Sequence, residues 1–479
     1  MNPIVEEKLE SFKTLEQKIF QFSCGIAQEM TKNILEGWDA GLAEGRDKKK
    51  YRDKGTRQTT IKTVYGEVTY RRHVYQTDTV EGKKAFIYLL DEAMGMEKIG
   101  LISANLAVRI AEAATESSYR VAAGQVSSTC GQSLSAQGAW NVVQRVGERI
   151  AREEDAAVRE MESGRSRGSK GAAVLFEEMD GVWLPMQDGH HKKMKKQEMK
   201  VFTMYEGWDA EKEKTGRSHL VGKVTLAGME KAQEFHKKRE ACIERIYDAD
   251  EIQQRVLNGD GGGWIREDYD PEAIFQLDRY HIYQDILRKV RDKKAQKEIR
   301  GLLEAGKTEE MLDYIKMYAD SVAGEEKGDR MSGDAMELYA YLDNNKEGLL
   351  PYQERGIRIP EAGEGIIYKA MGVQENQNCT VVTLRMKHRR MRWSVRGANN
   401  LAKALYKKEN GELHETIERF SDGQVLAVEI KEAVKTLSAA KAPKKDGKGD
   451  PYPDTIRAHM PLRDAIRTAA RKALLAAFN

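Results

Sequence analysis

One stretch of this 479-residue chain strongly constrains its fold: RVLNGDGGGWI at 255–265, a strand-like segment that ends in an aspartate among glycines. Glycine permits backbone conformations and close approaches that other residues do not, so a ligand can come near the backbone here. Asp-Gly is also common in tight turns, and a β-hairpin is the simplest explanation. The alternative is a catalytic carboxylate at a strand end, Asp260, which would need partners elsewhere in the chain.

The segments around Asp260 predict an α/β fold. Three strand-like segments precede it, at 172–187, 198–208 and 219–228, and a helical pattern lies at 229–247. The first segment is almost continuously apolar, as expected of a central strand. After Asp260, residues 273–290 have the periodicity of an amphipathic helix. The order strand, strand, strand, helix, strand, helix predicts a ribonuclease-H-like core, a mixed sheet that carries acidic residues at its centre.

Three acidic residues are candidates for that centre. Asp180 lies within the first strand, and the alternative is a turn at Asp180 with Glu177 or Glu178 facing the site. Asp260 follows the fourth strand. Glu375, in MGVQENQN, begins a helix that leads into a basic segment. An acid in a first helical turn is favoured there in any case, so a capping role for Glu375 is the alternative.

Three clustered carboxylates suit metal-dependent chemistry. Without a cation they would repel one another, and some would take up a proton. Magnesium prefers oxygen ligands and uses few protein carboxylates. A pair of such ions activates the attacking oxygen and stabilises the leaving oxygen in phosphodiester cleavage and strand transfer. We therefore expect two Mg²⁺ ions at Asp180, Asp260 and Glu375, with Mn²⁺ able to substitute.

The rest of the chain indicates a helical N-terminal region, a hairpin followed by a helix-turn-helix-like region, a core in two parts around an inserted helical block, and a tail with a closing helix. The helical N-terminal region is 1–50, and the hairpin and helix-turn-helix-like region is 51–165. The two parts of the core are 170–291 and 361–420, the inserted helical block between them is 292–360, and the tail is 421–479. The helix-turn-helix-like segment, with Ser133 or Ser135 as its cap, is equally compatible with a DNA reader and with any pair of antiparallel helices.

A basic segment without acids follows Glu375. Its cationic residues are Arg385, Lys387, Arg389, Arg390, Arg392 and Arg396. Such runs are often solvated faces, but the proximity to Glu375 favours contact with DNA phosphates. Trp393 lies among them, and a core position is favoured over stacking on an unpaired base.

Composition excludes some classes of protein. The net charge is +3, so local clusters matter more than the overall charge. The four cysteines are isolated, which argues against a zinc ribbon and favours a reducing, cytoplasmic compartment. The charged N-terminus is unlike a signal peptide, and no apolar run approaches the length of a membrane span, so we expect no membrane association.

The blocks EEMDGVWLP, LNGDGGGWI, FQLDRYHI and GVQEN…LRMKHRRMRWSVRGANNLAKAL, in this order, resemble those of bacterial insertion-sequence transposases of the ISLre-two type. These are similar in plan to Mutator-like transposases with a DDE triad. The segments TVYGEVTYRRHVY and YLLDEAMGM resemble N-terminal blocks of the same family, so the resemblance covers nearly the whole chain. It implies that Asp180, Asp260 and Glu375 are the metal-binding triad. It also implies that Asp278 and His281 match a recurring Asp/Cys-x-x-His motif near the site, although a histidine with a structural hydrogen bond is the alternative for His281.

The resemblance implies a DNA transposase. Metal-activated water would cleave at the ends of the element, and the freed 3′-hydroxyl would attack target DNA. The partners would be terminal inverted repeats and target DNA, bound by a homo-oligomer in the bacterial cytoplasm at the nucleoid. Two alternatives are a ribonuclease-H-like nuclease without strand transfer and a domesticated DNA-binding protein with an idle site.

Overall fold

The computed structural model describes residues 11–79, 82–94, 102–187, 195–216, 218–266, 272–324, 328–388 and 391–420. They belong to one compact unit, Met1–Val425. The tail predicted at 421–479 lies outside the described residues, as do Arg389 and Arg390 of the basic segment.

The N-terminal part packs a long helix against an antiparallel sheet. Its elements are α1 (Phe12–Gly45), β1 (Arg52–Thr63), β2 (Gly66–Asp78), β3 (Lys84–Ile87) and α2 (Leu89–Met94). The predicted hairpin is confirmed as β1–β2, with Thr63 paired to Gly66 across the turn. Gln28 of α1 donates to the Tyr65 carbonyl at 2.7 Å. A side chain at Gly66, where φ is +125°, would collide with the Gln28 amide, so this turn requires glycine.

Three helices follow, each with a serine N-cap. They are α3 (Ala104–Glu116), α4 (Tyr119–Thr129) and α5 (Ala136–Glu162). Of the two serines considered as the cap of α5, Ser135 has the role, because its hydroxyl accepts from the Gly138 amide at 3.0 Å. The three helices pack on one another through small apolar residues such as Ala111 and Val143. Helices α4 and α5 follow one another across a short connection, as the sequence predicted, and α5 is the longer of the two.

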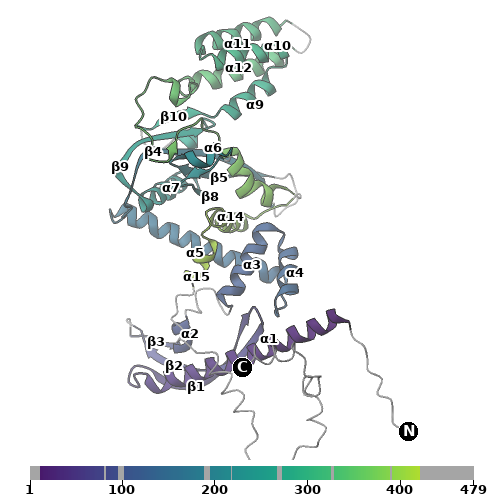
Figure 1. Ribbon diagram of the computed structural model, residues 1–479, viewed down its shortest axis with the longest axis vertical. Coiled ribbons are helices and arrows are strands. Elements are labelled where there is room, and N and C mark those ends of the chain that lie inside the picture. Colours follow the sequence, from purple (N-terminus) through teal and green to yellow (C-terminus); the bar gives the residue numbers. More distant parts are fainter. Residues whose placement is uncertain are drawn as a thin grey trace, which may run out of the picture. The chain divides into compact units, whose positions relative to one another are not determined.

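A mixed sheet forms the centre of the chain (Figure 1). Its strands are β4 (Lys170–Pro185), β5 (Lys196–Tyr205), β8 (Val224–Gly228), β9 (Tyr247–Gly259) and β10 (Ile274–Leu277). Their order is β10-β9-β4-β5-β8. Strands β4, β9 and β10 are parallel, while β5 runs antiparallel to both β4 and β8. The predicted α/β fold is therefore confirmed, and β4 is its central strand, with every residue from 174 to 180 buried.

Two expectations around Asp260 need correction. The hairpin explanation of RVLNGDGGGWI is wrong, because β9 has parallel neighbours on both sides and continues into a short helix, α8 (Gly263–Arg266). The helix expected over 273–290 is also wrong in its first part, because Ile274–Leu277 form β10 and the helix α9 (Arg279–Lys289) begins only after Asp278. A short apolar run does not distinguish a strand from a helix by its periodicity.

Helices cover the sheet, and a smaller sheet flanks it. The helix α7 (Ala232–Ile246) packs on α5 and β9, and the helix α14 (Val395–Glu409) packs on α5 and β8. The close approach of Gly147 in α5 to Asn400 in α14 leaves no room for a side chain at 147. The smaller sheet and its adjoining helix consist of β6 (Gly207–Asp209), β7 (Leu220–Val221), β11 (Ile366–Ile367) and α6 (Ala210–Lys214).

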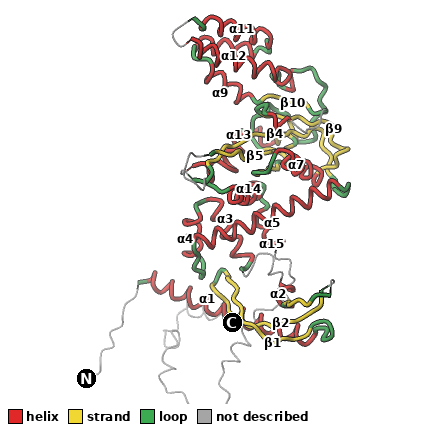
Figure 2. The backbone as a smooth tube through the Cα atoms, turned by 180° about the vertical axis from the view of Figure 1, so that it is seen from behind, coloured by secondary structure: helices red, strands yellow, loops and turns green. Residues whose placement is uncertain are grey.

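The segment predicted as a helical block contains packed helices (Figure 2). Helix α9 contacts α10 (Lys293–Glu304) and α12 (Gly328–Asn344), and α11 (Thr308–Val322) packs on both of these. Two 3₁₀ turns follow, η2 (Lys346–Gly348) and η3 (Tyr352–Glu354). None of the described helices combines the length and apolar character that crossing a membrane requires.

The last described elements lead back to the sheet. They are α13 (Gln374–Gln377), the π-helix η4 (Asn378–Lys387), α14 and α15 (Leu413–Arg419). A π-helix is rare and occurs frequently near functional sites. Here it packs on β4 and α14.

A buried ionic cluster joins α5, α7 and α14. The carboxylate of Glu230 lies 2.8 Å from both Lys238 and Lys403. Glu154 lies 3.0 Å from Lys238 and 2.9 Å from Lys403. Removing one member would leave an uncompensated buried charge, which is strongly destabilising.

We predict that this cluster makes the stability of the protein sensitive to acid. Burial raises the pKa of Glu230, but Lys403 and Lys238 outweigh it and lower the pKa from 4.5 to about 2. A carboxylate with a lowered pKa stabilises the fold above its unfolded pKa, and this contribution is lost as the pH falls through the folded pKa. Between pH 7 and pH 3 the difference in unfolding free energy between wild type and Glu230→Gln should shrink by about 2 kcal/mol in urea titrations.

The control is Glu211→Gln, since the Glu211 side chain is 78% exposed. Its effect on stability should be small at both pH values. A wild-type advantage over Glu230→Gln that is the same at pH 3 and pH 7 would contradict the prediction.

Candidate functional site

The strand register brings three aspartates into one row. In the parallel pairing, Gly259 of β9 lies opposite Met179 of β4 and opposite Leu277 of β10. The next residue of each strand is an aspartate: Asp260, Asp180 and Asp278. The row lies just past the carboxyl ends of β9 and β10, the edge at which open α/β sheets place their ligands.

Asp180 is held from two sides. Its Oδ1 accepts from the Gly181 amide at 2.7 Å, and its Oδ2 accepts from the Asn378 side chain at 2.5 Å. Burial raises the pKa of Asp180 to about 6, with a further increase from Asp260, while His281 and the hydrogen bonds oppose the shift. The Asp180 carboxyl group is therefore harder to ionise than one in water.

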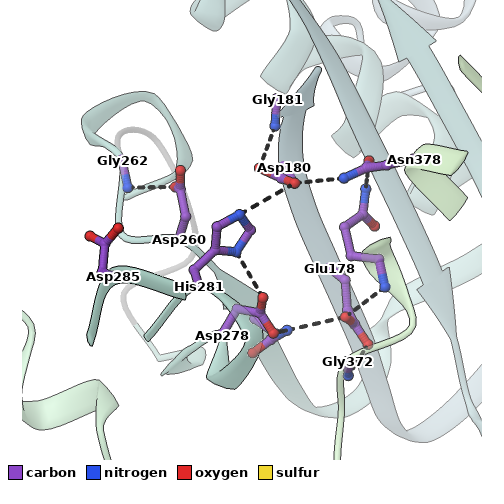
Figure 3. Close-up of polar contacts among 12 residues, drawn as sticks. Glu178, Asp180, Gly181, Asp260, Gly262, Asp278, His281, Asp285, Gly372 and Asn378 are labelled. Atoms are coloured by element: carbon purple, nitrogen blue, oxygen red, sulfur yellow. Dashed lines mark hydrogen bonds and ion pairs between the residues drawn. The ribbon is translucent and has the colours of Figure 1, made fainter. Parts of the chain in front are cut away.

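His281 lies among the three aspartates (Figure 3). Its Nδ1 is 2.8 Å from Asp278 Oδ2, and its Nε2 is 3.7 Å from Asp180 Oδ2. Burial lowers the pKa of His281, but the hydrogen bond to Asp278 and the charges of Asp180, Asp278 and Asp260 outweigh it and raise the pKa to about 9. Asp278 occupies the N-cap position of α9, so the i, i+3 spacing aligns the two side chains. The three aspartates therefore favour the protonated imidazolium form of His281.

The glycines around Asp260 shape a loop. Asp260 Oδ1 accepts from the Gly262 amide at 2.8 Å, and the Asp260 carbonyl accepts from the Tyr341 hydroxyl of α12 at 2.9 Å. Gly261 has a φ of +77°, and a Cβ there would lie 2.6 Å from Asn345 Oδ1. This glycine is explained by packing against the helical block, whereas the sequence analysis expected room for a ligand.

Glu178 shares a face of β4 with Asp180 and is fully buried. Five donors reach its carboxylate: the Tyr205 hydroxyl, the Asn258 side chain, and the backbone amides of Gly372, Val373 and Gln374, at 2.6–3.1 Å. Burial raises the pKa of Glu178, and the hydrogen bonds from Tyr205, Gly372 and Val373 oppose this. All five partners donate, which suits an ionised carboxylate. Glu178 therefore anchors the turn that precedes α13 (Figure 3).

Glu375 is positioned by this anchored turn. It lies in the first turn of α13 with an exposed side chain, next to the buried Gln374. Asn378, three residues later, is the side chain of this segment that contacts Asp180. Within the described ranges no three His, Cys, Asp or Glu side chains form a group that could hold a metal ion. The structure thus brings together Asp180, Asp260, Asp278 and His281, and it places Glu375 on the adjoining helix.

Sequence reasoning missed two contributors to the site. Asn378 carries no signal, because asparagine in a helix is ordinarily unremarkable. Glu178 was considered only as an alternative to Asp180, although the period of two in a strand places both on one face. Asn258 and Gln276 extend the Glu178 row across β9 and β10, with Asn258 donating to Glu178 at 3.1 Å.

The predicted DNA-binding residues occupy different environments. Arg385 is buried, donates to the Ala114 carbonyl at 2.6 Å, and lies over the rings of Tyr119 and Trp393. That is not the exposed position expected for phosphate contact. Lys387 and Arg392 are exposed, and Arg396 is exposed and paired with Glu148.

The expected core position of Trp393 is confirmed. The residue is 7% exposed, and its Nε1 donates to the Met386 carbonyl at 2.8 Å. The side chain therefore anchors the segment after η4 and is not a free stacking surface.

Residues 5–421 match the model of an uncharacterised protein family, UPF0236. The chain belongs to this family. A UPF0236 protein of Caldanaerobacter subterraneus subsp. tengcongensis, whose name joins designations from TTE0033 to TTE2212, is 25% identical over 83% of this chain and 78% of its own length. The UPF0236 protein in the vanSb 3′ region of Streptococcus gallolyticus is 24% identical over 79% of this chain and 76% of its own.

Among solved structures, this UPF0236 chain is similar to a chain of the Drosophila P element transposase strand transfer complex. The likeness covers 70% of this chain and 87% of that one, with 8% identity and a TM-score of 0.20. A likeness of this degree does not establish a shared fold.

We predict that Glu178→Gln destabilises this UPF0236 protein by about 3 kcal/mol. The variant side chain keeps its volume, but its amide group would face backbone N–H donors and leave them without an acceptor. Tyr205→Phe removes one of the five donors and should cost about 1 kcal/mol. Urea unfolding measures both values, and hydrogen exchange at the amides of residues 372–374 should accelerate in Glu178→Gln.

Glu364→Gln is the matched control, because Glu364 is an exposed carboxylate in the same part of the chain. It should change stability by less than about 0.5 kcal/mol. Equal effects of Glu178→Gln and Glu364→Gln would show that Glu178 does not anchor the turn.

Proposed function

We propose that this UPF0236 protein is a DNA transposase that cuts and joins phosphodiesters with a ribonuclease-H-like core. The observation that carries the proposal is the row of aspartates. Asp180 and Asp260 end up side by side on neighbouring parallel strands, although 80 residues separate them along the chain. Adjacent strands lie about 4.8 Å apart, so the sheet itself brings the two carboxylates within range of a shared cation.

The strand order supports the ribonuclease-H-like assignment. Numbered along the chain, the strands of the central sheet lie in the order 5-4-1-2-3, with the second strand antiparallel to the first and the fourth and fifth parallel to it. Helix α7 connects the third and fourth of these strands. The sequence predicts acids at the centre of such a sheet, where Asp180 lies within β4 and Asp260 directly follows the neighbouring parallel strand β9.

The residues present fit magnesium by their chemistry. Asp180 and Asp260 offer hard oxygen donors, and Mg²⁺ is commonly held by one or two protein carboxylates together with water and substrate phosphates. The raised pKa of Asp180, caused by burial and by Asp260, marks a site that a cation would stabilise. Glu375 is proposed as the third carboxylate. When bound, two such ions, or Mn²⁺ in their place, would activate the attacking oxygen and stabilise the leaving oxygen.

The protein's own groups position this chemistry. Asn378 and the Gly181 amide orient the carboxylate of Asp180. Asp278 fixes the ring of His281, whose positive charge lies beside Asp180 and would attract the phosphate of the bound DNA. Glu178 holds the turn before α13 and with it the position of Glu375.

Two further observations support DNA as the substrate. The helices α4 and α5 have the helix-turn-helix arrangement, and α5 continues to the core, where Asn400 donates to Gln144 at 2.8 Å. The name of the Caldanaerobacter relative joins eleven designations of one series for a single protein. Several copies in one genome are expected of a mobile element.

Two alternatives remain as outcomes of experiment. A nuclease with the same core would cut DNA but never join it. A domesticated DNA-binding protein would do neither. The aspartate row favours catalysis over the second alternative, because a buried carboxylate cluster costs stability when it has no use.

We predict that Asp180→Asn, Asp260→Asn and Glu375→Gln each reduce the rates of Mg²⁺-dependent cleavage and joining of DNA at least about a hundredfold. These substitutions keep the shape of the side chain and remove the charge that holds the cation. Double variants should be little worse than single ones, as expected of residues that act as a unit. Cleavage and strand-transfer assays on DNA that carries the ends of the element measure both steps.

Asp320→Asn is the control, because Asp320 is an exposed carboxylate on α11. It should keep full activity, and all four variants should bind DNA. Cleavage without joining by the wild-type protein would favour the nuclease, and an active Asp260→Asn protein would refute the proposed mechanism.

A further inference from the structure

A second candidate site lies where β4 ends. A pocket with a volume of about 450 Å³ is lined by residues of α4, α5, α14 and the segment around Trp393. Pockets of this size accommodate small ligands. Met186, which follows β4, is bridged to Trp393, and the Gln187 amide donates to the Trp393 carbonyl at 2.7 Å. The wall of the pocket is therefore continuous with the strand that carries Asp180.

The described lining of this pocket is cationic. It includes Arg385 and Arg392 and contains no acidic residue. Ser118 and Ser394 also line it, and these are the N-caps of α4 and α14. Two helix N-termini thus border one cavity, and their partial positive charge favours an anionic group such as phosphate there.

Aromatic rings form the rest of the wall. The Arg385 guanidinium lies over the rings of both Trp393 and Tyr119, with each ring centroid 5.5 Å away. Both rings are thereby used in packing. Trp140 of α5 lines the pocket as well and is half-buried, as Tyr119 is. Because Tyr119 and Trp393 lie over Arg385, we take the indole of Trp140 as the ring that a planar ligand would meet.

We propose that this pocket binds one unpaired nucleotide of DNA, with the base stacked on Trp140 and the phosphate at Arg392 and the two helix N-termini. Stacking on an aromatic ring beside cationic groups is how proteins hold single-stranded nucleic acid. The identification of the ligand as DNA rests on the proposed function. The pocket extends that function by a binding site for a base taken out of the duplex.

The position of the pocket sets where on the DNA this nucleotide lies. Gln187 follows Asp180 by seven residues of extended chain, which span about 23 Å. One strand of B-form DNA advances about 3.4 Å per nucleotide. The bound nucleotide would therefore lie several positions away from the bond that is cut, and the pocket would hold DNA beside the reaction centre without taking part in the reaction.

The test compares single-stranded and duplex DNA binding by the full chain. Fluorescence anisotropy with a labelled dT12 oligonucleotide and with a 12-base-pair duplex gives both affinities at one salt concentration. Trp140→Leu should weaken dT12 binding at least about fivefold, since it removes one stacked base, and leave duplex binding nearly unchanged. Trp140→Phe keeps an aromatic ring and should retain most of the dT12 affinity. Trp183→Leu is the control, because Trp183 is 53% exposed and lies outside the pocket.

Arginine variants test the phosphate part of the proposal. Arg392→Ala should weaken dT12 binding and reduce its dependence on salt, because one phosphate contact is lost. Arg330→Ala is the matched control, since the Arg330 side chain is 77% exposed on α12, and it should bind as the wild type does. Equal dT12 affinities of the two arginine variants would overturn the phosphate contact.

Two results would overturn the stacking role. One is wild-type affinity of Trp140→Leu for dT12. The other is an equal loss in Trp140→Leu and Trp140→Phe for both DNA forms, which would mean that Trp140 only supports the packing of α5. The failure of the proposed function is separate, because it would be seen as cleavage that persists in Asp180→Asn, whereas binding of dT12 requires no cleavage.

Discussion

The buried carboxylate of Glu178 is the interaction on which the architecture of the site depends. Burying an unpaired charge is very costly, so this strand position is tolerated only when donors surround the carboxylate. The donors come from β5, from β9 and from a turn 194 residues further along the chain. Three segments of the chain therefore converge on one pair of oxygens, and the start of α13 is positioned by the same contact that stabilises the centre of the sheet.

The sequence predicted those parts of the fold that local signals encode, namely the periodicity of apolar residues and the residues that begin or end an element. The central strand β4, the hairpin β1–β2 and the cap of α5 were found because apolar runs, alternation and a serine before a helix are local signals. Strand β10 was assigned to a helix because four residues, three of them apolar, are too few to show a period of their own. The role of Glu178 was missed for another reason: three of its donors are backbone amides, and a backbone amide is the same in every sequence.

The glycines around Asp260 were correctly predicted to mark a special backbone, but the physical cause differs from the one that the sequence suggested. They mark a special backbone, as the sequence indicated, and Gly261 has a positive φ. The atoms that approach it belong to Asn345, however, and the Asp260 carbonyl is held by Tyr341 of α12. The helical block is therefore part of the support for this aspartate. A block that only interrupted the core would have no reason to contact the loop at that point.

The pairing of the sheet determines the positions of the three aspartates of the site, but it does not determine the position of Glu375. Asp180, Asp260 and Asp278 follow residues paired in one register row, so a slip of one residue in any of these strands would turn the aspartate to the opposite face. The positions of these three carboxylates are therefore as secure as the sheet. Glu375 has no such constraint, because it stands on a four-residue helix between the turn held by Glu178 and the π-helix that begins at Asn378. The contacts of Glu178 with the Gln374 amide and of Asp180 with Asn378 thus take the place of strand pairing in bringing this last element to the aspartates.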